Sequence, residues 1–206
     1  MSCLLAALVA ALALLVLIEP TAPPGLGRID ASWRDLVSDA PSWMHGLSEA
    51  LKLLGSGAVM VPLRVGVAIW LLLRRRRWDA AAWLLGWAVA DLIAIGLKPM
   101  VGRPHPGGLG ASSFPSAHAK TAAQVAIGLV LVTTNPWRRR IVPWALALTW
   151  IAAMSVSRTV LHEHWLSDVV AGSLLGAASA VGVAAWLQRR RDRRYAEEGS
   201  VRPDRK

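Results

Sequence analysis

The stretch that decides the fold runs from residue 166 to residue 191 and reads LSDVVAGSLLGAASAVGVAAWLQRRR. After Asp168, no charged side chain occurs until Arg189, where a run of arginines begins. A helix needs about 20 predominantly apolar residues to cross the hydrocarbon core of a bilayer. Arginines are typical of the membrane surface where such a helix ends. This stretch therefore predicts a membrane-spanning helix over residues 166–188.

Five further apolar runs have the length of a membrane span, and polar, proline or glycine residues separate them. Together these runs predict six spans, at residues 3–19, 56–73, 79–97, 117–134, 141–157 and 166–188. The chain of 206 residues is 54% hydrophobic and only 17% charged, unlike a soluble domain of this length. The expected fold class is all-α: a polytopic membrane protein whose six-transmembrane-helix bundle forms a single domain, residues 1–188.

The first run and the single cysteine limit the other classes of protein. Residues 3–19 follow no positive residue, and no clear small-residue cleavage site comes after them, so they are interpreted as an uncleaved span, with a signal peptide as the alternative. Cys3 cannot form an internal disulfide and offers no metal-ligand spacing. No metal and no other cofactor is expected.

The net charge of +10 comes from short basic clusters rather than from one continuous basic face. Clusters lie at residues 74–77, at residues 138–140 and from Arg189 onward. This grouping argues against nucleic acid as a partner. Cytoplasmic loops carry an excess of Lys and Arg, so the clusters predict a multi-pass protein of the plasma (inner) membrane with both termini in the cytoplasm. Residues 189–206 are expected to form a disordered basic tail. The expected partners are membrane lipids, and no protein partner can be inferred.

This orientation places two linkers on the extracytoplasmic face, at residues 98–116 and 158–165. A third external segment, residues 20–54, separates the first two spans. Its large apolar residues recur at roughly helical intervals with polar residues between them: Trp33, Leu36, Trp43, Leu47, Leu51 and Leu54. The pattern predicts an amphipathic segment at the membrane interface.

The two linkers hold the cations that could bind a phosphate. Lys98, Arg103 and Arg158 lie there, on the face that the positive-inside pattern disfavours for basic residues. Arginine can bind a phosphate through two parallel hydrogen bonds, whereas lysine acts as a point charge. Ser116 stands at the start of a predicted helix, where free N–H groups favour an anion. The alternative is that the three cations anchor span ends by extending to lipid headgroups.

Two histidines and an aspartate complete a set able to transfer a phosphoryl group. His164 and Asp168 are four residues apart at the start of a span, so they share a helix face. A carboxylate there can bind one imidazole nitrogen and leave the other free to attack. His118, at the start of another span, is placed to protonate a leaving oxygen. His162 and Glu163 are given no role.

Three segments resemble the signature of the type 2 phosphatidic acid phosphatase (PAP2) and vanadium haloperoxidase superfamily. The signature reads Lys-x6-Arg-Pro, then Pro-Ser-Gly-His, then Ser-Arg-x5-His-x3-Asp. The third segment is matched in full, and the second has Ala117 in place of glycine. In the first segment Lys98 is matched, but His105 stands in the position of the arginine, and Arg103 lies two residues earlier. The resemblance runs from about Gly55 to the end of the last span.

This resemblance implies a membrane enzyme that hydrolyses a lipid phosphate or diphosphate without a metal. His164 would attack phosphorus and form a phosphohistidine, Asp168 would support it, and His118 would act as acid and then base. The phosphoryl oxygens would be bound by the following residues: Lys98, Ser116, Ala117, Arg158, and Arg103 or His105. The implied substrates are phosphatidic acid, phosphatidylglycerol phosphate and polyprenyl diphosphates. A lipid phosphotransferase and a non-catalytic phospholipid-binding or transport protein are the alternatives; the haloperoxidases are larger, soluble chains.

Two charged residues lie inside predicted spans, where charge is costly. They are Arg64 in the second span and Asp91 in the third. We expect the two to pair within the bundle, or Asp91 to orient Lys98, which lies seven residues further along the chain. A tilt that brings Arg64 to an interface is the alternative.

Overall fold

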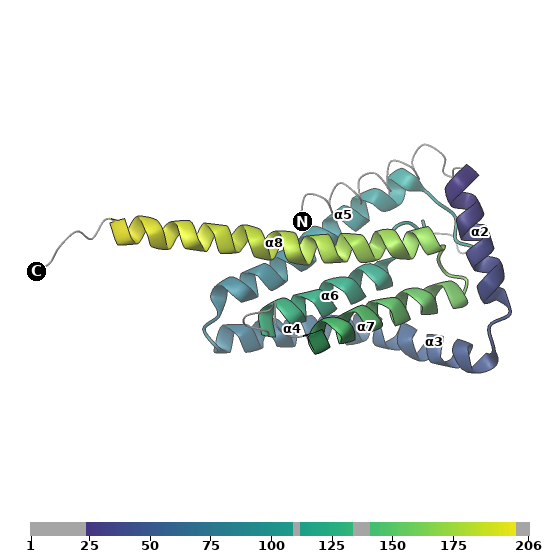
Figure 1. Ribbon diagram of the computed structural model, residues 1–206, viewed down its shortest axis with the longest axis horizontal. Helices are drawn as coiled ribbons and strands as arrows, with labels where there is room; N and C mark the ends of the chain where they lie inside the picture. The colour runs from purple at the N-terminus through teal and green to yellow at the C-terminus, as the bar shows by residue number, and fades with distance from the viewer. Residues whose placement is uncertain (1–23, 109–111, 134–140, 201–206) are drawn as a thin grey trace, which may run out of the picture.

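The computed structural model describes residues 24–108, 112–133 and 141–200, and all regular structure in these ranges is helical. The helices are α2 (Pro24–Ser38), α3 (Ser42–Leu54), α4 (Gly57–Leu73), α5 (Arg77–Val101), α6 (Ala117–Thr133), α7 (Ile141–Val160) and α8 (Leu166–Ser200). Figure 1 shows an elongated bundle, with α2 crossing the end at which α8 begins. The all-α class predicted from the sequence is confirmed over these residues.

Within the described ranges, three helices, α5, α7 and α8, are long and apolar enough to cross a membrane. The pair α3 and α4 meets at a bend of 46° and passes the same test as one broken span, while α6 is a shorter apolar helix. The predicted first span, residues 3–19, lies outside the described residues. The count of six spans therefore stays a prediction.

Helix α6 lies in the middle of the bundle, and most of its side chains are buried. A helix that is apolar on all sides is typical of such an enclosed position. Two glycines of α8, Gly172 and Gly176, allow α8 to approach α6 closely, because a methyl group at either position would overlap a backbone carbonyl of the 116–120 segment. Small residues at helix contacts are the usual means of close packing in membranes. This contact fixes the two helices that begin at the candidate site.

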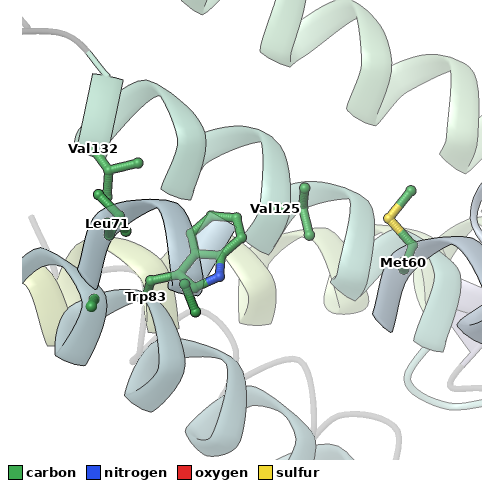
Figure 2. Close-up of a cluster of buried hydrophobic side chains, with 7 residues drawn as sticks. Met60, Leu71, Trp83, Val125 and Val132 are labelled. Carbon is green, nitrogen blue, oxygen red and sulfur yellow. The ribbon is translucent and has the colours of Figure 1, made fainter. Parts of the chain in front are cut away.

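One apolar cluster joins α4, α5 and α6 away from the site (Figure 2). It includes Met60, Leu71, Trp83, Val125 and Val132, of which Leu71 is fully buried. The indole Nε1 of Trp83 donates a hydrogen bond of 2.9 Å to the carbonyl oxygen of Arg64, so the one polar group of this side chain is satisfied. The cluster holds the outer helices against α6.

The segment expected to lie at the interface forms two helices, α2 and α3. Several of its large apolar side chains are exposed, among them Leu36, Trp43 and Leu47. Asp30 and Ser48, by contrast, are buried against the bundle. The two helices therefore have the amphipathic character that the sequence predicts, but their inward faces carry polar groups that the periodicity did not indicate.

The sequence predicts disorder from Arg189 onward, whereas α8 continues through Ser200. In Figure 1 this end of α8 extends beyond the other helices. Extending an existing helix requires no new nucleus, and Arg, Ala and Glu have high helix propensity. Local propensity therefore explains a helix in a stretch that is too charged to pack.

The approach of α8 to α6 gives a test of the packing. Replacing Gly176 with alanine places a methyl group against the carbonyl oxygen of Lys120, a backbone atom that cannot rotate away. Overpacking of this kind costs about 1–3 kcal/mol, so Gly176→Ala is expected to lower the thermal unfolding midpoint in detergent. The control is Gly96→Ala in α5, where an added methyl group meets nothing. Equal midpoints for the two variants would contradict the packing described.

Candidate active site

The candidate site lies at the end of the bundle where α5 ends, α6 begins and the α7–α8 turn lies. Gly102 ends α5 with a positive φ of 58°, and its N–H donates to the carbonyl of Lys98, as is common at helix C-termini. The chain then passes His105 and returns to α6, whose first turn carries His118. Ser116 N–H donates a bond of 3.1 Å to the carbonyl of Asp168, which ties the start of α6 to α8. The end of the linker 98–116 is thus joined to the first turn of α8.

The nucleophile and carboxylate predicted from the sequence are neighbours. His164 Nδ1 lies 3.7 Å from Asp168 Oδ2, with both side chains buried. This separation is longer than a hydrogen bond, although catalytic contacts are commonly long before substrate binds. Asp168 Oδ2 also accepts the backbone N–H of Trp165 at 3.0 Å, which fixes the carboxylate at the first turn of α8. The Nδ1 edge of His164 therefore faces Asp168, and Nε2 is its other nitrogen.

Burial sets the protonation of His164. Desolvation lowers the pKa of its imidazole below the ordinary value, and the neighbouring Asp168 opposes this effect by favouring the charged form. This lowered pKa favours the neutral form of the ring, in which one nitrogen carries a lone pair.

His105 occupies the same site as His164. Their ring centroids are 5.0 Å apart, and His105 Nδ1 contacts the carbonyl oxygen of Glu163. Desolvation and the charge of Lys98 lower the pKa of His105, with Asp168 opposing them. Lys98 donates a hydrogen bond of 2.8 Å to the carbonyl of Ser112. His105 of the first motif segment thus lies beside the histidine of the third, and Lys98 is near enough to His105 to affect its pKa.

Arg158 is the most buried cation of the site, with no exposed surface. Its Nη2 pairs with the carboxylate of Glu163, which also accepts a bond of 2.6 Å from Lys52 of α3. Its Nε and Nη1 have no hydrogen-bond partner among the described residues. Buried guanidinium donors without partners are rare in folded proteins and need an explanation. The backbone carbonyl of Arg158 accepts the N–H of His164 at 3.3 Å, so the main chain at Arg158 adjoins that of the predicted nucleophile.

The start of α6 provides further groups. The side chain of Ser116 is fully buried, and its hydroxyl has no partner within the described part of the chain. Ala117 is exposed and begins the helix, where the first N–H groups have no intrahelical acceptor. His118 interacts electrostatically with Arg158 and His164. It also lies against the α3–α4 junction, since a methyl group at Gly55 would come within 2.9 Å of its ring.

Arg103 lies differently from the other cations. It is buried, and its guanidinium donates to two carboxylates, to Asp168 Oδ1 at 2.9 Å and to Asp30 Oδ2 at 2.6 Å. Its Nη1 also lies 2.6 Å from the hydroxyl of Ser167. The sequence offered Arg103 and His105 for the same position, and in the structure His105 is the one whose ring lies beside that of His164.

The geometry above coincides with the result of comparisons with known proteins. Residues 79–192 match the sequence profile of the PAP2 superfamily, and the match covers more than half of the chain. The chain belongs to the PAP2 superfamily. The resemblance drawn from the three motif segments is thereby confirmed.

Two curated relatives of this PAP2 chain are phosphatases. The chain is 38% identical over 82 residues to phosphatidylglycerophosphatase B of Escherichia coli (strain K12). The aligned region covers 38% of this chain and 30% of that protein. It is 33% identical over 132 residues to decaprenylphosphoryl-5-phosphoribose phosphatase of Mycobacterium tuberculosis (strain ATCC 25618 / H37Rv). Here the aligned region covers 58% of this chain and 68% of that protein. The match to the first relative spans less than a third of that protein.

Two solved structures have the same fold. A transmembrane PAP2-type phosphatidylglycerolphosphate phosphatase from Bacillus subtilis superposes with a TM-score of 0.76 at 21% identity, covering 91% of this chain and 96% of that chain. LpxE of Aquifex aeolicus gives 0.62 at 20% identity, with coverage of 74% and 93%. At these identities the likeness shows the fold alone, and that fold is a membrane fold. The predicted membrane class is confirmed.

A second ion cluster, with buried cations and a partly exposed carboxylate, lies between α4, α5 and α6. Arg64 pairs with Asp91 at 3.8 Å, as the sequence predicts. Lys120, one turn after Ser116 on α6, pairs with the same carboxylate. Arg64 also donates to the hydroxyl of Thr121 at 3.0 Å and stacks on Trp87 at 4.3 Å. Asp91 therefore compensates two cations, and the alternative that it orients Lys98 has no contact to support it in the described residues.

Several residues of the site region were missed from the sequence. Glu163 was given no role but pairs with Lys52 and Arg158. Lys120 was detectable, because a lysine inside an apolar run is itself a signal. No feature of the sequence pointed to Asp30. An aspartate is common on an amphipathic helix, and the partners of Asp30 are distant in the chain. Within the described residues, no group of three or more His, Cys, Asp or Glu side chains has an arrangement suited to a metal.

The burial of His164 predicts where its ring titrates. In histidine-labelled protein, ring ¹⁵N shifts are expected to give a midpoint below about 6.5, the value for a free imidazole. Because Asp168 favours the charged ring, Asp168→Asn is expected to lower that midpoint further. The signal is assigned by its loss in His164→Ala. A midpoint above about 6.5, or a rise on removing the carboxylate, would contradict this electrostatic description.

Proposed function

We propose that this chain is a metal-independent lipid phosphate phosphatase that acts through a phosphohistidine on His164. The observation that carries the proposal is the fully buried Arg158, whose Nε and Nη1 have no partner among the described residues and whose backbone binds the nucleophile's own N–H. A phosphoryl group is the ligand that satisfies a guanidinium in this way. The phosphatase names of the relatives agree with this chemistry.

The first step is attack on phosphorus. The Nε2 lone pair of His164 forms a P–N bond while the bond from phosphorus to the lipid oxygen breaks. His118 gives its proton to that oxygen, so that the lipid leaves as an alcohol or, from a diphosphate, as a lipid phosphate. Asp168 stabilises the positive charge that forms on the imidazole.

The second step returns the enzyme to its starting state. His118, now neutral, takes a proton from water, and the resulting oxygen nucleophile attacks the phosphohistidine. The P–N bond breaks, inorganic phosphate leaves, and His164 regains its neutral form. An alcohol in place of water would make the same enzyme a phosphotransferase.

The cations and N–H groups around His164 stabilise the transferring group. Arg158, Lys98 and His105 supply the side chains, while the hydroxyl of Ser116 and the N–H of Ala117 supply neutral donors. Fixed donors aimed at developing charge are the main source of catalysis in phosphoryl transfer. In this proposal Arg103 does not bind phosphate, because both of its carboxylate partners are already in place.

An apolar cavity supports a lipid as the leaving group. It has a volume of about 480 Å³ and lies between the α3–α4 junction, α6 and α7, with Leu54, Leu129 and Trp150 among its walls. Leu54 precedes Gly55, which lies against His118. One wall residue of the cavity is thus next in the chain to a residue that adjoins His118, the proposed acid. The volume of the cavity is within the range of ligand sites. Phosphatidic acid, phosphatidylglycerol phosphate and polyprenyl diphosphates are the proposed substrates.

The proposed placement in the membrane follows from charge. Basic clusters at residues 74–77 and from Arg189 onward mark the cytoplasmic side of the plasma membrane. The site, at the opposite end of α8, then faces the extracytoplasmic side, within a single domain of residues 1–188.

Phosphate release from a panel of lipid phosphates and diphosphates in detergent tests the proposal. Wild type is expected to release phosphate, and His164→Ala to lower the rate by about a thousandfold or more, because the nucleophile is lost. The control is His45→Ala in α3, which removes a histidine remote from the motifs and is expected to retain full activity. Activity in His164→Ala, or none in wild type on any substrate, would contradict the proposal. Product phosphorylated on an added alcohol would indicate transfer.

A further inference from the structure

Asp30 of α2 is a buried carboxylate that the mechanism above does not use. It is 1% exposed, although it lies on a helix whose outer face is open. Its Oδ1 accepts the backbone N–H of Ser167 at 2.9 Å, and its Oδ2 accepts the Ser167 hydroxyl at 2.7 Å. Asp30 thus binds the first turn of α8, where unpaired N–H groups and the helix dipole favour an anion.

The same carboxylate binds the guanidinium that reaches the catalytic aspartate. Arg103 donates from Nη2 to Asp30 and from Nη1 to Asp168, at 2.6 and 2.9 Å. Arg103 is 3% exposed and Asp168 has no exposed surface. A buried guanidinium between two carboxylates is held in plane by both, and each carboxylate has a cationic hydrogen-bond partner. The three residues come from α2, the α5–α6 connection and α8.

In this arrangement the two carboxylate oxygens of Asp168 have different partners. Oδ1 is bound by Arg103, whereas Oδ2 accepts the Trp165 N–H and faces His164. The bond back to Trp165 is the reciprocal half of a helix capping box. A carboxylate held at both oxygens cannot rotate, so Oδ2 stays directed at the Nδ1 edge of His164.

We propose that Asp30 is a positioning residue for the nucleophile, acting through Arg103 and Ser167 to hold Asp168 against His164. The inference rests on the proposed function. It gives α2 a part in the active site in addition to its place at the membrane interface, and it assigns Arg103 to support of the aspartate.

Attachment of α2 alone does not require this ion bridge. Trp33 donates a bond of 3.0 Å to the hydroxyl of Thr159, and Arg34 lies over the ring of Trp165 at 5.6 Å. These contacts already join α2 to α7 and to the turn before α8. Burying a charged triad is costly and often gives no net stability relative to apolar residues, so a role in catalysis explains it better than docking does.

The direct test is Asp30→Asn, which keeps the shape of the side chain and removes its charge. It is expected to lower kcat by about ten- to a hundredfold, the usual effect of losing a group that orients a functional residue, with KM changed less than about twofold. The matched control is Asp35→Asn on the exposed side of the same helix, whose carboxylate lies 3.6 Å from Arg34. A kcat for Asp30→Asn equal to that of the control would overturn the proposal, as would a change in KM alone.

A double-mutant cycle separates positioning from stability. If Asp30 acts through Asp168, then in an Asp168→Asn background the second change is expected to lower kcat by less than about twofold. Loss of stability alone would give the full reduction in both backgrounds, and that result would overturn the proposal. If Asp30→Asn cannot be recovered as a monodisperse protein, Ser167→Ala takes its place. It removes the hydroxyl link and is expected to lower kcat by about three- to tenfold, since one hydrogen bond is lost, and an unchanged kcat would contradict the proposal.

A readout without substrate keeps this inference distinct from the proposed function. Ring ¹⁵N shifts report which nitrogen of His164 carries the proton. Wild type is expected to be protonated at Nδ1, facing Asp168, and Asp30→Asn to give a mixture of the two tautomers. If Asp30→Asn keeps the tautomer of the wild type, the proposal is overturned, even where the wild-type enzyme is fully active. If wild type has no phosphatase activity, the mixture would still support the positioning role while the proposed function fails.

Discussion

The position of the Asp168 carboxylate is the constraint on which the rest of the site depends. A buried carboxylate is stable only when its oxygens are bound and its charge is compensated. Here Arg103 and the Trp165 N–H bind the two oxygens, and the first turn of α8 supplies a favourable dipole. One oxygen of Asp168 is left facing His164, so the need to satisfy a buried anion also sets which edge of the His164 ring faces the carboxylate.

The packing of the helices fixes the other groups of the site relative to Asp168. Gly172 and Gly176 bring α8 against α6, so that Ser116 N–H meets the carbonyl of Asp168 and the start of α6 is fixed beside His164. Gly102 ends α5 so that the chain brings His105 to the same place. The Asp91 cluster compensates the cations inside the bundle. Close helix contacts and paired charges thus produce one polar site at the end of an apolar bundle.

The sequence predicts the groups that act through local spacing and misses those that act across the fold. His164 and Asp168 share a helix face at a spacing that any helix would produce, and the three motif segments indicate the PAP2 family correctly. The pairing of Arg64 with Asp91 was also readable, because charges inside apolar runs are rare. Asp30 was missed because its partners, Arg103 and Ser167, lie far away in the chain. Glu163 was missed because one partner, Lys52, is equally distant, and its pairing with Arg158 depends on the turn between α7 and α8 rather than on a helical spacing. The helix at the start of the basic tail was missed because charge density argues against packing but not against helix formation.

The measurement that tests the central claim most directly is to trap the phosphoenzyme. Wild type is mixed with a lipid phosphate labelled at phosphorus, quenched within milliseconds in alkali, and digested for mass spectrometry, since a phosphohistidine survives alkali but not acid. The expected result is label on His164 that is absent from His164→Ala. Phosphate release by wild type with no label on His164, or with label on another residue, would contradict the mechanism.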